Sequence, residues 1–77
     1  MIEIEANETA EKIRRTGLPD LVVEGVERHG RTGFYRIRCR YTGPTFQREG
    51  RLFLTGMRFW ISSVHEWTRL CRLLRRG

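Results

Sequence analysis

Three arginines at alternate positions in FYRIRCRYT (residues 34–42) are the residues best suited to chemistry. If this stretch is an extended strand, Arg36, Arg38 and Arg40 point to one face and the residues between them to the other. Three like charges at that spacing repel one another unless an anion lies across them. Because a guanidinium binds phosphate through a rigid bidentate fork, the pattern predicts a surface that meets a polyanion.

Aromatic side chains alternate with further arginines in two later stretches, RLF and RFW, and fall on the same predicted face. Flat rings accept unpaired bases by stacking, which contributes about 1–3 kcal/mol per base. A duplex is the alternative, because a ribbon of arginines can read guanine edges in a major groove, but that mode leaves the rings unused. A single strand is therefore slightly preferred. The predicted nucleic-acid-binding residues are Arg36, Arg38, Arg40, Arg51, Arg58, Phe53, Trp60 and, from the last helix, Arg69.

The charge of the chain is unevenly distributed. The net charge is +6, and fourteen of the fifteen basic residues are arginine. Residues 1–30 hold seven acidic and four basic groups, which gives −3, whereas residues 31–77 hold two acidic groups and eleven arginines, which gives +9. The positive charge thus belongs to the second part of the chain, which indicates a basic surface rather than a uniformly basic protein.

The elements that must position these residues begin with a predicted short strand, MIEIE, followed by a helix. Asn7 can cap a helix from Glu8 to about Thr16, with acidic residues in its first turn and basic residues in its last, as the helix dipole favours. The next predicted strand is LVVEGVER (residues 21–28), in which Gly25 indicates a bulge or a close backbone approach. The loop HGRTG turns this strand back onto FYRIRCRYT as an antiparallel hairpin.

The rest of the chain predicts further strands and one clear helix. Residues 46–48 and 51–55 favour a second hairpin, and residues 58–62 another strand. Ser63 with Glu66 three residues later is typical of a capping box at a helix start. Apolar residues then recur at helical spacing and define a buried stripe of Trp67, Leu70, Cys71 and Leu74.

This order predicts a single α+β domain over residues 1–77, written β-α-β-β-β-(β)-α. A small antiparallel sheet of three to five strands has one face covered by a short N-terminal helix and a C-terminal amphipathic helix. The covered face is expected to hold Tyr35, Ile37, Cys39, Tyr41, Leu52, Leu54, Phe59 and Ile61. The open face is expected to hold Phe34 and the strand residues of the predicted nucleic-acid-binding set.

Two other functions fit the same sequence. The open face could belong to an interaction module that meets a second copy of the chain or binds and inhibits an acidic protein, and Glu24 could pair with Arg38 across the first hairpin. A ribonuclease toxin is the third hypothesis, because His29 and His65 could supply acid–base catalysis. Nothing in the sequence brings these two histidines together, so no catalytic residue is assigned and an enzyme is not the prediction.

Several kinds of site have no support in the sequence. His29, Cys39, His65 and Cys71 lack the paired spacing of structural zinc sites, and no phosphate-cradling glycine motif occurs. No metal, cofactor or small-molecule substrate is therefore predicted. The acidic N-terminus lacks the apolar segment of a secretory signal, and no apolar run approaches the roughly 20 residues that span a bilayer. The expectation is a cytoplasmic protein without a membrane partner, and two cysteines that are buried thiols.

Overall fold

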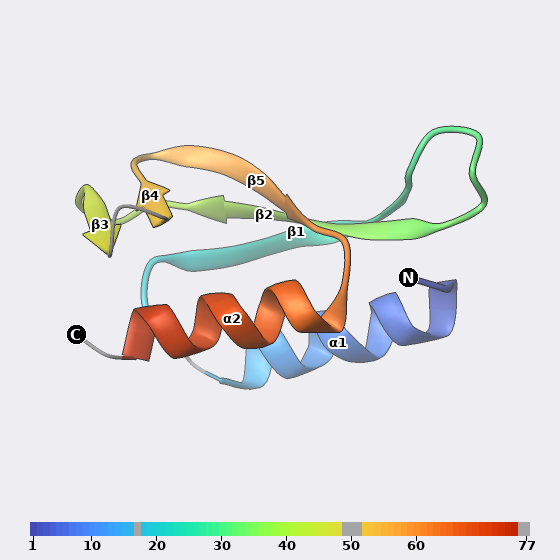
Figure 1. Ribbon diagram of the computed structural model, residues 1–77, viewed down its shortest axis with the longest axis horizontal. Helices are drawn as coiled ribbons and strands as arrows, with labels where there is room; N and C mark the ends of the chain where they lie inside the picture. Colours follow the sequence, from blue (N-terminus) through green and yellow to red (C-terminus); the bar gives the residue numbers. More distant parts are fainter. Residues whose placement is uncertain (17, 49–51, 76–77) are drawn as a thin grey trace.

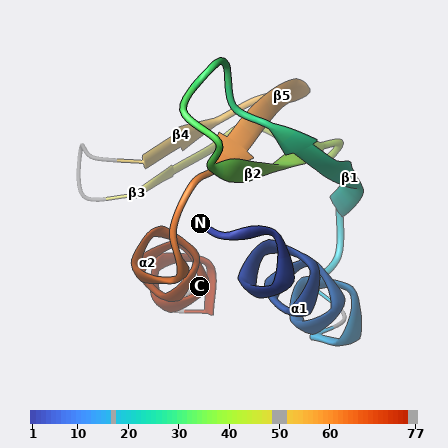
Figure 2. The same cartoon turned by 90° about the vertical axis from the view of Figure 1, so that its right-hand side faces the viewer.

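The computed structural model describes residues 1–16, 18–48 and 52–75, and these form two layers (Figures 1 and 2). In chain order the elements are α1 (Glu3–Arg15), β1 (Leu21–Arg28), β2 (Tyr35–Tyr41), β3 (Phe46–Arg48), β4 (Leu52–Leu54), β5 (Met57–Ile61) and α2 (Val64–Arg75). Strands β1, β2 and β5 make a three-stranded antiparallel sheet in the order β1-β2-β5, and β3 and β4 make a separate hairpin. Both helices lie side by side on one face of the sheet, so the predicted α+β class is confirmed.

The predicted N-terminal strand is wrong, because α1 already begins at Glu3. The alternation of Ile2 and Ile4 suggested a strand, but these side chains are 61% and 68% exposed. The stripe that buries against the sheet is instead Ala6, Thr9, Ala10 and Ile13, which recurs at helical spacing. Asn7 lies inside the helix rather than at its cap. Tertiary burial of this stripe, together with Glu3 and Glu5 near the positive end of the helix dipole, favours the longer helix.

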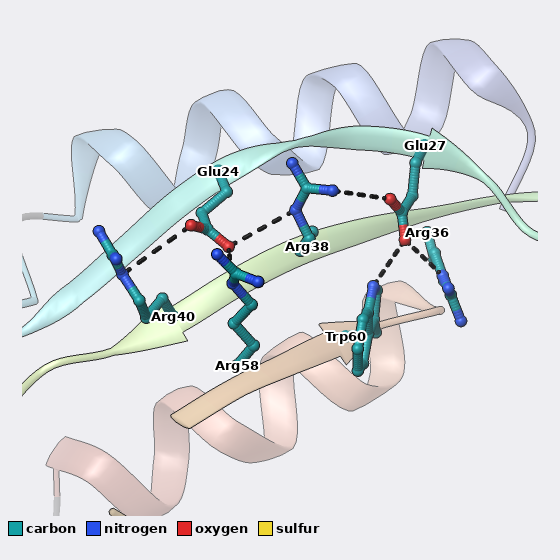
Figure 3. A network of polar contacts seen from close by, with 7 residues as sticks. All are labelled: Glu24, Glu27, Arg36, Arg38, Arg40, Arg58 and Trp60. Atoms are coloured by element: carbon teal, nitrogen blue, oxygen red, sulfur yellow. Dashed lines mark hydrogen bonds and ion pairs between the residues drawn. The ribbon is translucent and has the colours of Figure 1, made fainter. Parts of the chain in front are cut away.

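Strands β1 and β2 form the predicted hairpin, and β1 contains the predicted bulge. Val23 pairs with Cys39 and Gly25 with Arg38, so Glu24 is an extra residue without a partner in the register. In a regular strand, residues three apart point to opposite faces. Because the bulge inserts one residue into this segment of β1, the alternation of faces shifts by one residue, and both carboxylates reach the open face (Figure 3).

Strand β2 is central, and its odd-numbered residues supply the middle of the core. Ile37, Cys39 and Tyr41 are 0%, 0% and 6% exposed, as predicted for the covered face. Strand β5 adds Ile61, which pairs with Ile37 in the register. On the open face, Arg38 of β2 lies opposite Trp60 of β5, and Arg40 lies opposite Arg58. The register between the two strands therefore places these side chains next to one another.

One tight contact joins the turn after α1 to the end of β2. Asp20 has a φ of 68°, a left-handed conformation that Asp tolerates better than most residues. Its carbonyl oxygen accepts a hydrogen bond from the Thr42 amide at 2.8 Å. A Cβ at Gly43 would come within 2.6 Å of Asp20 Oδ2 and 2.8 Å of its Cβ, so this approach requires glycine.

The capping box that begins α2 is present, displaced by one backbone group. The Glu66 amide donates to Ser63 Oγ at 3.1 Å, and Glu66 Oε2 accepts from the amide of Ser62 at 2.8 Å rather than from that of Ser63. Trp67 and Leu70 are buried as predicted, at 7% and 8% exposed, and Leu73 joins them at 8%. Cys71 and Leu74 are only partly buried and flank the core.

Candidate functional site

Seven residues from three strands form one polar network on the open face of the sheet (Figure 3). Strand β1 supplies Glu24 and Glu27, β2 supplies Arg36, Arg38 and Arg40, and β5 supplies Arg58 and Trp60. We call these residues the arginine network. Four guanidiniums and two carboxylates leave it with a net charge of +2. The arginines repel one another less than their spacing suggests, because β1 places an anion beside each of them.

Glu27 holds one end of the arginine network. Its Oε1 accepts from Arg36 Nε at 2.9 Å and from the indole Nε1 of Trp60 at 2.6 Å, while Oε2 accepts from Arg38 at 3.1 Å. The hydrogen bond from Trp60 is the main cause that lowers the pKa of Glu27 below its ordinary value, and Arg36 and Arg38 add to it against the opposing effect of burial. The carboxylate is thus stabilised in its charged form.

Trp60 is fixed on two sides by the same end of the arginine network. Its indole nitrogen donates to Glu27, and the guanidinium carbon of Arg36 lies 4.6 Å from the ring centroid, a cation–π contact. The residue nevertheless stays 43% exposed. The ring is therefore held by two contacts and has one face already occupied by Arg36.

Glu24 holds the other end and is the most buried charged group there, with its side chain 16% exposed. Its carboxylate lies 3.0 Å from Arg58 Nε, 3.5 Å from Arg38 Nε and 3.9 Å from Arg40 Nε. Two of these atoms, Glu24 Oε1 and Arg38 Nε, are buried without a hydrogen bond of acceptable geometry. The contact is accordingly electrostatic, one anion shared among three cations. The predicted pairing of Glu24 with Arg38 is confirmed.

The geometry of these contacts leaves part of each outer guanidinium available. Arg40 and Arg58 approach Glu24 most closely through Nε, and an arginine has five N–H donors. Their side chains are 48% and 61% exposed, compared with 28% for Arg36. The terminal nitrogens of Arg40 and Arg58 can therefore bind an acceptor outside the protein while Nε stays against the carboxylate.

The remaining predicted residues lie beside the arginine network or outside the described chain. Phe53 is 54% exposed on β4. Arg69 lies on α2, and together with Phe53 and Trp60 it lines a groove between α2 and strands β4 and β5. Arg51 lies outside the described residues. Phe34 is 54% exposed in the loop directly before β2 and does not line this groove.

Sequence reasoning missed the role of Glu27. A strict alternation from Glu24 puts Glu27 on the covered face, and only the bulge at Gly25 reverses that assignment. Gly25 was a usable signal, since one inserted residue moves every later side chain to the other face. The hydrogen bond from Trp60 to Glu27 joins residues 33 apart and follows from the order of the strands, which no local pattern reveals.

The histidines and cysteines considered for other chemistry lie on different parts of the fold. His29 lines a hollow with Phe34 and Ser62 at the loop end of the sheet, and His65 is exposed on α2 and does not line that hollow. Burial raises the pKa of the Cys39 thiol to about 11. Within the described ranges, no three His, Cys, Asp or Glu side chains are grouped so that they could hold a metal ion.

Neither helix in the part of the chain that the structure describes has the length and apolar character that a bilayer crossing requires. Comparison of the chain with models of protein families gives no match, and comparisons with curated proteins and with solved structures give none either, so no relative assigns a function to the open face.

Proposed function

We propose that this protein binds nucleic acid through the open face of its sheet, with Arg40 and Arg58 as the main phosphate contacts. The supporting observation is that four guanidiniums lie on one face of the sheet, and that the two most exposed of them meet Glu24 most closely through Nε. A guanidinium that meets the carboxylate most closely through Nε retains N–H donors on its terminal nitrogens. A phosphate can then be bound without breaking the arginine network.

The two carboxylates act as positioning groups in this proposal. An unpaired arginine side chain loses about 1.5–2 kcal/mol of rotamer entropy when a ligand immobilises it. Glu24 and Glu27 already restrict the arginines in the free protein, so part of that loss precedes binding. The same carboxylates reduce the net charge of the arginine network to +2, which predicts modest affinity that is sensitive to salt.

The test is a titration of labelled oligonucleotides, single-stranded and duplex, at two salt concentrations. The variant Arg40→Gln/Arg58→Gln removes the proposed phosphate contacts. Its matched control is Arg14→Gln/Arg72→Gln, which removes the same charge from exposed positions on the helices. Circular dichroism checks that both variants fold.

The wild type is expected to bind with an affinity that falls steeply with salt. Each phosphate contact that is lost lowers the magnitude of the log–log slope by roughly 0.7–0.9, so Arg40→Gln/Arg58→Gln should lose about 1.5 and the control close to nothing. Equal losses in the two variants would mean that net charge alone attracts the oligonucleotide. No binding by the wild type at low salt would reject the proposal.

A second candidate is a protein interface on the same face. The observation that favours it is that Glu24 and Glu27 balance half of the charge of the four arginines, because a paired charge is far less costly to bury against a partner than an isolated one. In a second copy of the chain, the same rows of Glu and Arg could pair reciprocally. A molecular mass that rises with concentration at physiological salt, together with no oligonucleotide binding, would support this candidate instead.

A further inference from the structure

A groove of about 320 Å³ opens beside the arginine network, between α2 and strands β4 and β5. Its walls come from apolar residues of both layers, including Phe59 of β5 and Leu70 of α2. Phe53 and Trp60 stand at its border and are 54% and 43% exposed. A volume of this size lies at the lower end of small-ligand sites, which range over roughly 300–1,000 Å³. It therefore has room for one flat ring system rather than for a helix of a partner protein.

Arginines at and near the groove can bind the phosphates that adjoin an occupant. Among the described residues, Glu66 is one of two charged residues that line the groove, and its carboxylate, which accepts from the Ser62 amide at 2.8 Å, offsets the charge of the other. The other is Arg69, which is exposed and has no ion-pair partner among the described residues. Arg58 precedes the groove residue Phe59 on β5 and carries a side chain that is 61% exposed. The groove thus combines aromatic walls with Arg69 on its helix side, and Arg58 lies outside it, on the open face of β5.

Trp60 connects the groove to the arginine network. The same residue lines the groove, donates its indole N–H to Glu27 and lies under the guanidinium of Arg36. A chain whose phosphates lie along Arg40 and Arg58 would therefore pass the mouth of the groove. An unpaired base of that chain could enter, whereas a base in a duplex is stacked and paired and could not.

We infer that the groove is a base-binding site and that the nucleic acid bound by this protein is single-stranded. The inference rests on the proposed function and adds the strandedness of the ligand and a specific place for a base. Phe53 supplies a freely accessible ring for stacking, and Arg69 binds the phosphate on the helix side. Phe59 and Leu70 form the apolar wall that excludes water from the base.

The experiment compares three probes of equal length: a labelled oligothymidylate, an abasic strand with the same sugar–phosphate chain, and a duplex that contains the oligothymidylate. Phe53→Ala is the test variant. Its matched control is Phe34→Ala, because the two phenylalanines are both 54% exposed but only Phe53 lines the groove. Since both side chains are exposed, neither variant should unfold.

The wild type is expected to bind oligothymidylate at least roughly 5-fold more tightly than the abasic strand or the duplex, as one stacked base requires. Phe53→Ala should lose this preference while it still binds the abasic strand, and Phe34→Ala should keep it. Equal affinity of the wild type for all three probes, still steeply dependent on salt, would overturn the base site and leave the phosphate contacts standing. Absence of binding to every probe would overturn both proposals.

A self-associated protein is the remaining outcome. If sedimentation shows a dimer whose dissociation is promoted by Phe53→Ala and not by Phe34→Ala, the groove is filled by a second copy of the chain. That result would also overturn the base site.

Discussion

Removal of the charge of Glu24 is expected to change the stability of the protein and its affinity for nucleic acid in opposite directions. Glu24→Gln keeps the shape of the side chain but removes the anion that lies 3.0, 3.5 and 3.9 Å from three guanidiniums. The net charge of the arginine network rises from +2 to +3. The protein is expected to become less stable and, at the same time, to bind nucleic acid more tightly.

The expected magnitudes follow from the exposure of the partners. Exposed ion pairs contribute about 0.2–1 kcal/mol each, and the three arginine side chains are 42–61% exposed. We therefore expect the free energy of unfolding to fall by about 1–2 kcal/mol, which for a domain of this size lowers Tm by roughly 5–15 °C. A unit charge about 6 Å from a phosphate in water contributes ~0.7 kcal/mol. Its removal should raise the affinity at low salt roughly 3-fold.

The assays are urea and thermal denaturation, followed by circular dichroism, and titration of the labelled oligothymidylate. Glu11→Gln is the matched control, because it makes the same charge change on α1, at a side chain that is 56% exposed and pairs with Arg14 at 3.2 Å. The control should change the free energy of unfolding by less than about 0.5 kcal/mol and should leave the affinity almost unchanged.

Two results would refute this reasoning. If Glu24→Gln unfolds like Glu11→Gln, the shared carboxylate does not stabilise the sheet face. If Glu24→Gln is less stable and also binds the oligonucleotide less tightly, Glu24 does not compete with phosphate for the arginines. Its orienting effect would then outweigh its charge.

Three further predictions concern acid stability, thiol reactivity and packing. The folded-state pKa of Glu27 is depressed below 4.5, so the contribution of its carboxylate to stability is present above that pH and is lost as the pH falls through the folded pKa. In urea denaturation, Glu27→Gln should therefore lose less stability between pH 6 and pH 3 than the wild type does. Cys39 is 0% exposed with a pKa raised to about 11, so a thiol reagent at neutral pH should label the native protein at Cys71 alone, and Cys71→Ser should abolish fast labelling. Gly43→Ala brings a Cβ against the side chain of Asp20 and should lower the free energy of unfolding by about 1–3 kcal/mol. Gly56→Ala is the control and should be nearly neutral in the same assay, because no atom lies within 4 Å of the added Cβ.

Much of the sheet could be predicted because its signals are local. The alternation along residues 35–41 assigns both faces of β2, and Ile37 and Cys39 are indeed fully buried. Hairpin loops and the Ser63–Glu66 capping box likewise depend on residues close in sequence. The predicted start of the first helix, at Glu8, was wrong because two patterns compete in the N-terminal residues. The alternation of Ile2 and Ile4 is local, whereas the advantage of the helix comes from burying Ala6 and Ala10 against a sheet formed later in the chain.

The candidate site was predicted only in part, for the same physical reason. The arginines and aromatic residues could be assigned to the open face from spacing alone. Of their partners, Glu24 could be predicted beside Arg38, whereas Glu27 could not, because its position depends on the bulge in β1 and its contact with Trp60 depends on β5 lying beside β2. The open face therefore carries a network in which two carboxylates balance half of the positive charge of the four arginines.

The bulge in β1, together with its two acidic residues, also determines how β1 aligns with β2. If β1 paired with β2 without the extra residue, Glu27 would oppose Tyr35 on the covered face, and Val26 would face the arginines. Such an alignment buries a carboxylate among apolar side chains, and the cost of that burial rejects it. The acidic residues thus discriminate between alternative alignments of one chain as it folds, whatever the face later binds. Deletion of Gly25 would remove the bulge and the extra twist that a bulge introduces. Glu24 and Glu27 would then be two residues apart and would stay on one side of a straight strand. Sheet twist and surface charge can therefore be varied independently in this small protein.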